Sequence, residues 1–387
     1  MRWIPLHAMK NKFIPRPQSG STLLELLIAV GITLFLVSAA AYVYLGTRES
    51  QGATERTSTS NETGAYALQL LGREIMNAGF YPSTMPAIPS LTASAPARGR
   101  LLETSNTYPP AGGAPIAKVT DWTAPAAAYF NPIFGCEGAQ FDHVTAKCDT
   151  TVAGDPDSIV INYFTNESRD TSAAMGQRLD CTGSDVANDP SNAVRKLNTP
   201  RPIPQLLVAA TTMSNTVAPQ QPLFASNRYG LKTGTKMVVN VGMKDVDVVT
   251  QSLVCSGNGS SFFGTANSTA NQPIIAGIDD LQFTYGVFST DDTRAPDRFY
   301  TATEVNTLTT ISIGGVPMSP WARVVAVRVC LMTSTLGANT KIADKTGALR
   351  TYLDCADQSI SQPASDVSIH KRHVQIFGVR NRLNQGF

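Results

Sequence analysis

The chain has 387 residues, and its 31 Lys and Arg against 29 Asp and Glu give a formal net charge of only +2. This near balance excludes a nucleic-acid binder that works through a strongly basic face. Hydrophobic residues make up 42% of the chain, which suits a folded protein rather than a disordered one. The length exceeds the usual ~100–200 residues per domain, so it allows one large domain or two modest ones.

The N-terminal region combines a basic flank with a long apolar run. Residues 1–20 contain Lys and Arg but no acidic residue, and residues 23–45 are almost wholly apolar. A helix of this length rises about 34 Å, enough for a hydrocarbon core of ~30 Å. The basic flank favours a cytoplasmic N-terminus, which puts everything after Arg48 in the periplasm of a bacterium. The run is too long for a cleaved secretory signal, but an uncleaved signal anchor remains an alternative.

Glu25 is the one acidic residue inside this apolar run. A carboxylate in a membrane-spanning helix costs on the order of 2.5–3.5 kcal/mol or more. A simple anchor has no reason to keep such a residue. Glu25 therefore indicates a partner for the helix.

Residues Gly20-Ser21-Thr22-Leu23-Leu24-Glu25-Leu26-Leu27-Ile28-Ala29 resemble the type IV prepilin signature, a Gly followed by an apolar helix with Glu at its fifth residue. The resemblance implies that a prepilin peptidase removes a cytoplasmic leader, residues 1–20, by cutting between Gly20 and Ser21, and that it methylates the new terminus. The family usually has Phe where Ser21 stands. In the family this Glu, here Glu25, neutralises the terminal amine of a neighbouring subunit during assembly.

The helix is predicted to continue well beyond the apolar run. No proline interrupts residues 48–64, and Leu68, Leu71 and Ile75 recur with helical spacing, which predicts a face packed on a globular domain. Gly79 fits a helix C-cap. We therefore expect a leader at 1–20, a long helix at 21–80 with a transmembrane or fibre-core half at 21–47, and a periplasmic globular domain at 81–387.

The globular part shows a proline-rich stretch followed by strand patterns. Proline is frequent between residues 82 and 132, which argues against regular sheet there. Strand patterns cover residues 158–165, 236–241, 246–255, 278–288, 321–332 and 373–379. The apolar residues of 281–287 alternate as in a half-buried antiparallel strand. The expected fold is α+β, a long N-terminal helix packed on a C-terminal antiparallel sheet, similar to pilins.

Several blocks in this part are similar to the PilW group of minor pilins. They are residues 61–65, 73–80, 278–287, 321–328 and 379–382. The resemblance implies a low-abundance subunit of the type IV pilus that helps to start assembly and lies at or near the tip, with a role in twitching motility. The partners it implies are other minor pilins, the major pilin, a large tip adhesin, the prepilin peptidase and the inner-membrane assembly platform. The protein would first be a single-pass inner-membrane protein and would then move to the pilus tip at the cell surface.

Six cysteines are present without the CxxC spacing of zinc ribbons. An even count in a periplasmic domain predicts disulfides, whereas six reduced thiols are the alternative for a cytosolic protein. Cys136 and Cys148 are close in sequence, and Cys330 and Cys355 are expected to meet at a sheet edge. Cys181 and Cys255 remain as the third pair.

No motif for catalysis or for a cofactor is found in the sequence, so we expect neither an enzyme nor a bound metal. His370 and His373 favour a solvated basic turn over a metal site. The acidic pairs Asp155/Asp157, Asp279/Asp280 and Asp291/Asp292 lack the spacing of a calcium loop and fit turns or strand ends.

Two other functions remain open. A minor pseudopilin of a type II secretion system would share the leader, Glu25 and the helix-on-sheet plan, and only the blocks after residue 60 favour the pilus. A membrane-tethered periplasmic enzyme or binding module is the second alternative, but a tether has no need for Glu25.

Overall fold

The structure is a computed structural model. It describes residues 22–80, 131–142, 147–152, 154–168, 180–183, 222–241, 244–257, 272–289, 295–313, 316–335, 350–362 and 368–383. The chain divides into two compact units, residues 1–55 and residues 56–387.

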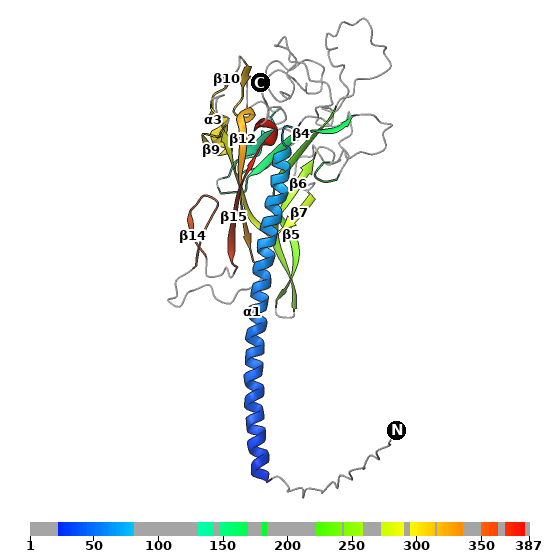
Figure 1. The fold of residues 1–387 in the computed structure, drawn as a ribbon, viewed down its shortest axis with the longest axis vertical. Coiled ribbons are helices and arrows are strands. Elements are labelled where there is room, and N and C mark those ends of the chain that lie inside the picture. Colours follow the sequence, from blue (N-terminus) through cyan, green and yellow to red (C-terminus); the bar gives the residue numbers. More distant parts are fainter. Residues whose placement is uncertain are drawn as a thin grey trace, which may run out of the picture. The chain divides into compact units, whose positions relative to one another are not determined.

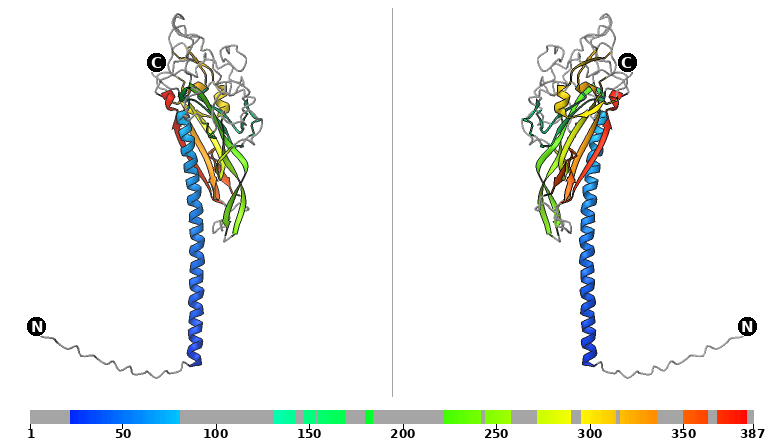
Figure 2. Two further views of the ribbon diagram at one scale, coloured as in Figure 1. Left: turned by 90° about the vertical axis from the view of Figure 1, so that its right-hand side faces the viewer. Right: turned by 90° about the vertical axis from the view of Figure 1, so that its left-hand side faces the viewer.

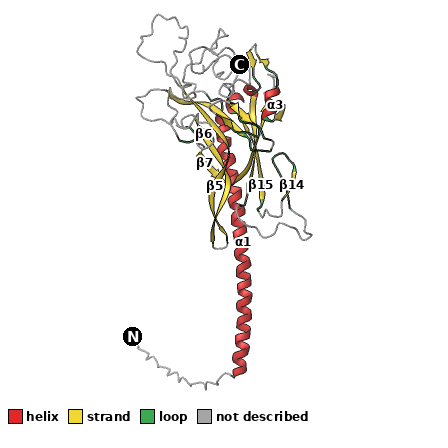
Figure 3. Ribbon diagram, turned by 180° about the vertical axis from the view of Figure 1, so that it is seen from behind, coloured by secondary structure: helices red, strands yellow, loops and turns green. Residues whose placement is uncertain are grey.

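Helix α1 extends from Leu23 to Asn77 and contributes to both units. In the second unit it lies against the strands, with β15 on one flank and β5, β6 and β7 on the other (Figures 1 and 3). Leu68, Leu71 and Ile75 are buried there, as their helical spacing predicted. The amphipathic part of α1 therefore forms one wall of the hydrophobic core.

The larger sheet has five antiparallel strands in the order β1-β4-β5-β6-β7. These strands are β1 (Ile133–Cys136), β4 (Ser158–Ser168), β5 (Pro222–Val241), β6 (Lys244–Gly257) and β7 (Gln272–Ala276). The smaller sheet has four antiparallel strands in the order β15-β12-β8-β9. Its strands are β8 (Ile278–Val287), β9 (Arg298–Tyr300), β12 (Val324–Ser334) and β15 (His370–Gly378). Side views show both sheets on one side of the C-terminal part of α1 (Figure 2).

Shorter elements complete the described part of the second unit. The two-stranded pairs are β2 (Phe141–Asp142) with β3 (Lys147–Cys148), β10 (Ile311–Ile313) with β11 (Val316–Met318), and β13 (Thr351–Leu353) with β14 (Ser359–Ser361). The remaining helical segments are α3 (Ala302–Thr307), the 3-10 turn η3 (Trp321–Arg323) and α4 (Arg380–Leu383).

Aromatic side chains fill the centre of the core where β1, β8 and η3 meet. Trp321 is fully buried, and its ring centroid lies 4.9 Å from those of Phe134 and Tyr285. The indole N–H of Trp321 donates to Asn306 Oδ1 at 2.8 Å, so this large side chain is buried without losing its hydrogen bond.

The buried carboxylate of Asp157 ties the two sheets together. It accepts the backbone N–H of Gly138, next to β1, at 2.7 Å and that of Phe283, in β8, at 2.8 Å. The backbone N–H of Asp157 donates to the carbonyl of Leu281 at 2.8 Å. Burial raises the pKa of Asp157 to about 7, although the N–H groups of Phe283 and Gly138 lower it in part.

The C-terminal end of α1 is capped from the far end of the chain. Gly79 takes the left-handed conformation, with φ +70°, which fits the C-cap role predicted from the sequence. The side-chain amide of Asn381 in α4 lies 3.4, 3.3 and 3.0 Å from the carbonyl oxygens of Met76, Asn77 and Ala78. The carbonyl of Asn77 also accepts the backbone N–H of Phe80 at 3.0 Å, so Asn381 and the backbone together cap this end of the helix.

The predicted α+β plan, one long helix followed by antiparallel sheets, is confirmed. Two details differ. Residues 321–323 form a 3-10 turn before β12 rather than its first residues, and β15 begins at His370 rather than at His373. The first part of β5 was not predicted at all, because its sequence carries polar residues where a buried strand usually has apolar ones. The domain boundaries proposed from the sequence remain predictions.

Two glycines allow the helix to approach β15 closely. A Cβ added to Gly72 would lie 2.2 Å from the ring of Phe377, and one added to Gly64 would lie 2.4 Å from the ring of His373. Both rings come from β15 and face α1. Any side chain at these two positions must therefore displace the ring of His373 or Phe377 or move β15 away from the helix.

We expect Gly72→Ala to destabilise the domain, although alanine favours helix by about 1 kcal/mol over glycine. Overpacking against Phe377 should cost up to about 3 kcal/mol, which exceeds the gain in helix propensity and leaves a net loss. Thermal unfolding of the full chain in detergent, followed by near-UV circular dichroism, measures this change. Gly52→Ala is the matched control, because an added Cβ there meets nothing within 4 Å. A Gly72→Ala variant as stable as Gly52→Ala would contradict the contact.

Asp157 makes the stability of the domain depend on pH. The folded-state pKa, about 7, lies above the value of 3.8 expected for an exposed Asp, so the folded state keeps its proton where the unfolded state has lost it. The free energy of unfolding should therefore fall as the pH rises from about 4 to about 7, by on the order of 2–4 kcal/mol, and then level off.

Chemical unfolding of the full chain across this pH range measures the effect. Asp157→Asn should remove most of the slope of the free energy of unfolding against pH. Asp155→Asn, at an exposed neighbouring position, should keep this slope. Equal slopes in the two variants would show that another group causes the pH dependence.

Candidate functional site

Helix α1 begins with two reciprocal hydrogen bonds between Thr22 and Glu25. The backbone N–H of Thr22 donates to Glu25 Oε2 at 3.0 Å, and the backbone N–H of Glu25 donates to Thr22 Oγ1 at 3.3 Å. This arrangement is a capping box, and it places the carboxylate at the helix end that favours negative charge. Sequence reasoning treated Glu25 only as a charge and missed the cap, although Thr-x-x-Glu before an apolar run is its signature. Gly20 and Ser21, the predicted processing residues, lie outside the described residues.

The side chains that follow Glu25 form an apolar surface. The large apolar residues between Leu23 and Leu45 are 49–82% exposed. Among the described residues, α1 is the one helix long and apolar enough to cross a membrane, judged by length and composition. An exposed apolar surface of this extent is typical of a segment that lies in lipid or against other apolar helices.

The six cysteines form three pairs in the second unit. Cys136 pairs with Cys148, Cys181 with Cys255, and Cys330 with Cys355. The Cα atoms of the three pairs are 5.5, 6.2 and 5.7 Å apart, within the usual range for disulfides. These are the pairs proposed from the sequence.

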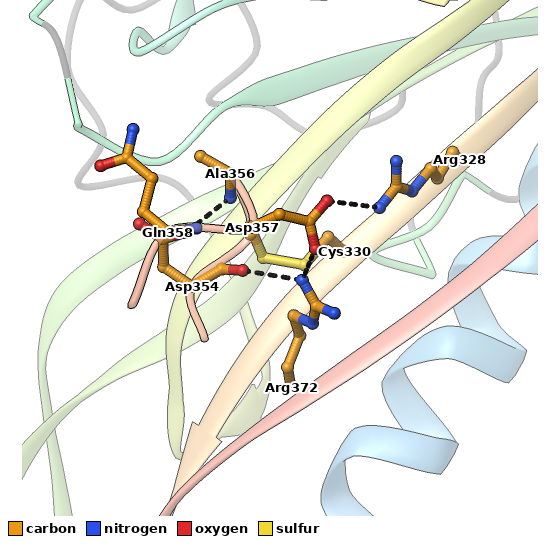
Figure 4. Close-up of polar contacts among 8 residues, drawn as sticks. Arg328, Cys330, Asp354, Ala356, Asp357, Gln358 and Arg372 are labelled. Carbon is orange, nitrogen blue, oxygen red and sulfur yellow. Dashed lines mark hydrogen bonds and ion pairs between the residues drawn. A yellow bond between two sulfur atoms is a disulfide. The ribbon is translucent and has the colours of Figure 1, made fainter. Parts of the chain in front are cut away.

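The third disulfide holds hairpin β13–β14 on the outer face of the smaller sheet (Figure 4). Beside it, the carboxylate of Asp357 lies between two arginines, 3.6 Å from Arg328 Nη2 and in an ion pair with Arg372. Arg372 Nη1 also donates to the carbonyl of Asp354 at 3.0 Å. Hydrogen bonding to Arg372 lowers the pKa of Asp357, which therefore stays ionised. We call the Cys330–Cys355 bond together with these polar contacts the hairpin clamp.

The hairpin turn itself is shaped by acidic side chains. Asp354 Oδ1 accepts the backbone N–H groups of Ala356 and Gln358 at 2.9 and 2.8 Å. Asp357 has φ +61°, a left-handed conformation that Asp tolerates better than most residues. The turn therefore directs the Asp357 carboxylate toward Arg328 in β12 and Arg372 in β15, although the side chain stays exposed to solvent (Figure 4).

The prediction of a solvated basic turn at His370 and His373 is wrong. Both residues lie in strand β15, and neither side chain is fully exposed. His370 Nδ1 lies 3.5 Å from Asp279 Oδ2, and its ring stacks on Tyr352 with centroids 4.4 Å apart. His373 Nε2 lies 3.0 Å from Thr333 Oγ1, and burial, then Lys371, lowers the pKa of His373. The strand continues through these residues because the two rings are packed on its two faces.

In the part of the chain that the structure describes, the residues of the acidic pairs make structural hydrogen bonds and ion pairs. Asp157 joins the sheets, and Asp279 pairs with His370. Asp280 accepts the backbone N–H of Leu281 and the side chain of Gln282, and burial raises its pKa. Among the described residues, no group of three or more His, Cys, Asp or Glu side chains could hold a metal ion. Asp291 and Asp292 lie outside them.

A buried polar cluster that sequence reasoning missed lies between α1 and β5. The side-chain amide of Asn227 donates to Glu74 Oε2 and to the hydroxyl of Tyr163, each at 3.1 Å. Burial, followed by the charge of Glu74, raises the pKa of Tyr163 and of Tyr229. The cluster fixes the helix on the larger sheet, and nothing in its geometry points to catalysis.

Comparison with known proteins relates the C-terminal part of the chain to a family. Residues 233–382 match the family model of the type IV pilus-assembly protein W. Three of the five blocks that resembled this group, residues 278–287, 321–328 and 379–382, lie inside the match. A solved structure, a type IV-like pilin from Thermus thermophilus, aligns with 83% of this chain and 96% of its own at 8% identity and a TM-score of 0.30. No curated protein matches the chain.

We expect all six cysteines to be oxidised in the native protein. Alkylation of the unfolded, unreduced chain should then leave its mass unchanged, and peptide mapping should find Cys330 joined to Cys355. Reduction before alkylation is the control, because it should expose six reactive thiols. Labelled cysteines without prior reduction would contradict the pairing.

Proposed function

We propose that this chain, whose residues 233–382 match the family model of the type IV pilus-assembly protein W, is a minor pilin of the type IV pilus. In this role it helps to start pilus assembly and then lies at or near the tip. It would contact other minor pilins, the major pilin, a large tip adhesin and the inner-membrane assembly platform. Its work is structural, and it catalyses no reaction.

The observation that carries this proposal is the start of helix α1. Glu25 is fixed by Thr22 in the first turn of a helix whose next side chains are apolar and exposed. A leader cut between Gly20 and Ser21 would leave the new amine one residue before the capping box. The carboxylate and the amine would then lie at the same helix end, where the carboxylate of one subunit can neutralise the amine of a neighbouring subunit.

The membrane orientation is part of the proposal. With the basic leader in the cytoplasm, Glu25 lies near the cytoplasmic interface, where water reaches the carboxylate. Inside a fibre this water is lost, and a buried charge that has a partner costs far less than an isolated one. The charge of Glu25 would therefore favour entry into the fibre only when another subunit neutralises it.

The family match also bears on the alternatives. A minor pseudopilin of a type II secretion system would share the leader and Glu25, but the match over residues 233–382 supports the pilus. Neighbouring genes separate the two functions, since minor pilins and a tip adhesin indicate a pilus and several pseudopilins with a secretin indicate secretion. A tethered periplasmic module gives no role to Glu25.

We predict that Glu25→Ala and Glu25→Gln both reduce surface piliation and twitching severalfold in a strain that lacks the gene. Glutamine can still complete the capping box with its amide oxygen, but it carries no charge. Loss of function in both variants therefore identifies the charge, rather than the helix cap, as the requirement. Sheared pili and co-isolation with the other minor pilins measure the effect.

Thr22→Val is the matched control, because it removes the capping hydroxyl and keeps the carboxylate. It should assemble nearly normally. Mass spectrometry of each variant should find the mature chain beginning at Ser21 at normal cellular levels, which separates assembly from processing. Full piliation with both Glu25 variants would show that the charge is dispensable and would favour the tethered module.

A further inference from the structure

Strand β15 is the terminal strand of the smaller sheet. It pairs with β12 on one side only, over nine consecutive positions without a register shift. Its other edge pairs with no strand in the part of the chain that the structure describes. Edge strands of this kind offer a row of backbone groups to any extended segment that approaches them.

Two hydrogen bonds fix the direction of the backbone groups of β15. At one end the N–H of Val379 donates to the carbonyl of Val325 at 2.8 Å, and at the other the carbonyl of Ile369 accepts the N–H of Thr335 at 3.0 Å. In an antiparallel strand, the N–H and C=O groups of successive residues point alternately to one edge and to the other. The odd-numbered residues between these two bonds therefore face β12, and the even-numbered residues face the free edge.

Val374 and Ile376 are the even-numbered residues in the middle of the strand. Their N–H and C=O groups point to the free edge, and their side chains are 40% and 55% exposed. They share the outer face of the sheet with Cys330 and Arg328, to which they are paired. The side chains of the opposite face, such as Phe377, contact α1. One strand thus offers both unpaired backbone groups and uncovered apolar side chains.

Exposed apolar residues gather around this edge. Six large apolar side chains after residue 55 are strongly exposed among the described residues, and four of them belong to β15, to the residue just before it or to hairpin β13–β14. These four are Leu353, Ile369, Val374 and Ile376. The hairpin clamp holds the hairpin at Arg328, Cys330 and Arg372, and among the described residues Val374 and Ile376 beside it remain 40% and 55% exposed.

The usual protection of an edge strand is absent from the second half of β15. Natural edges are blunted by charges, proline, a bulge or short length. Residues 373–378 contain no Lys, Arg, Asp, Glu or Pro. Lys371, at the start of the strand, is exposed and makes no ion pair with a described residue. The edge is therefore apolar in its middle and positive at its N-terminal end.

We propose that the free edge of β15 binds an extended segment of a partner protein, which adds one strand to the smaller sheet. The chemistry of the edge defines the segment. It has β-branched or other apolar side chains at alternate positions, to cover Val374 and Ile376, and an acidic residue beside Lys371. The inference goes beyond the proposed function, because the role of Glu25 in assembly does not require this edge.

A defined peptide tests the proposal on the purified full chain in mild detergent. The probe is a fluorescein-labelled nonapeptide in which valine and threonine alternate and one end carries two glutamates. Fluorescence anisotropy gives its affinity, and hydrogen–deuterium exchange reports protection of residues 370–379. Binding should slow exchange in this segment. The same peptide with N-methyl groups on alternate amides should bind about tenfold more weakly or worse, because it cannot complete the ladder.

Variants separate the edge from nonspecific apolar binding. Ile376→Lys should weaken binding about tenfold or more. Val152→Lys, at a side chain that is 50% exposed elsewhere on the domain, should leave it unchanged. Equal binding of the N-methylated peptide, or no binding at ~1 mM probe, would overturn the proposal. So would a dimer of the chain that Ile376→Lys abolishes in sedimentation velocity, because a second copy would then occupy the edge. The measurement needs no pilus, so its failure is distinct from a failure of the Glu25 test.

Discussion

Helix α1 is one continuous helix, but the side chains of its first and last parts have different surroundings. Its first part carries large apolar side chains that are exposed, and its last part buries a narrow face against two sheets. Gly64 and Gly72 on that face bring the helix backbone close to β15, and the rings of His373 and Phe377 fill the space that a side chain would take. The position of β15, and with it the hairpin clamp, depends on this close contact.

Buried polar groups decide how the sheets are placed around the helix. Asp157 receives N–H groups from both sheets, and Glu74 reaches β5 through Asn227. A buried polar group without a partner costs about 1–3 kcal/mol, whereas apolar contacts tolerate small shifts. These contacts therefore favour one arrangement of the sheets among the many that apolar packing alone would allow.

The sequence was informative where a pattern repeats over a short distance. The apolar run and the later helical spacing predicted α1, and the alternation of residues 281–287 predicted β8. The capping box of Thr22 and Glu25 was missed, although both residues lie within one turn and the pattern could have predicted it. The first part of β5 could not be predicted, because Asn227 and Arg228 are buried polar residues whose partners, Glu74 and the carbonyl of Phe141, come from distant segments. The Cys330–Cys355 bond of the hairpin clamp was predicted, but its ion pairs between Asp357 and the two arginines were not, for the same reason.

The cap that Asn381 places on α1 joins residues 304 positions apart in the chain, with its amide 3.3 Å from the carbonyl of Asn77. Strand β15, which the helix touches through Gly64 and Gly72, also comes from the last residues to be made. A ribosome synthesises the helix first and these contacts last. The helix therefore waits, with one face uncovered, until almost the whole chain exists. A chain that ends before residue 370 would keep the contacts of α1 with the larger sheet but would lack those of Gly64, Gly72 and the C-terminal cap, so burial of the helix is complete only when almost the whole chain has been made.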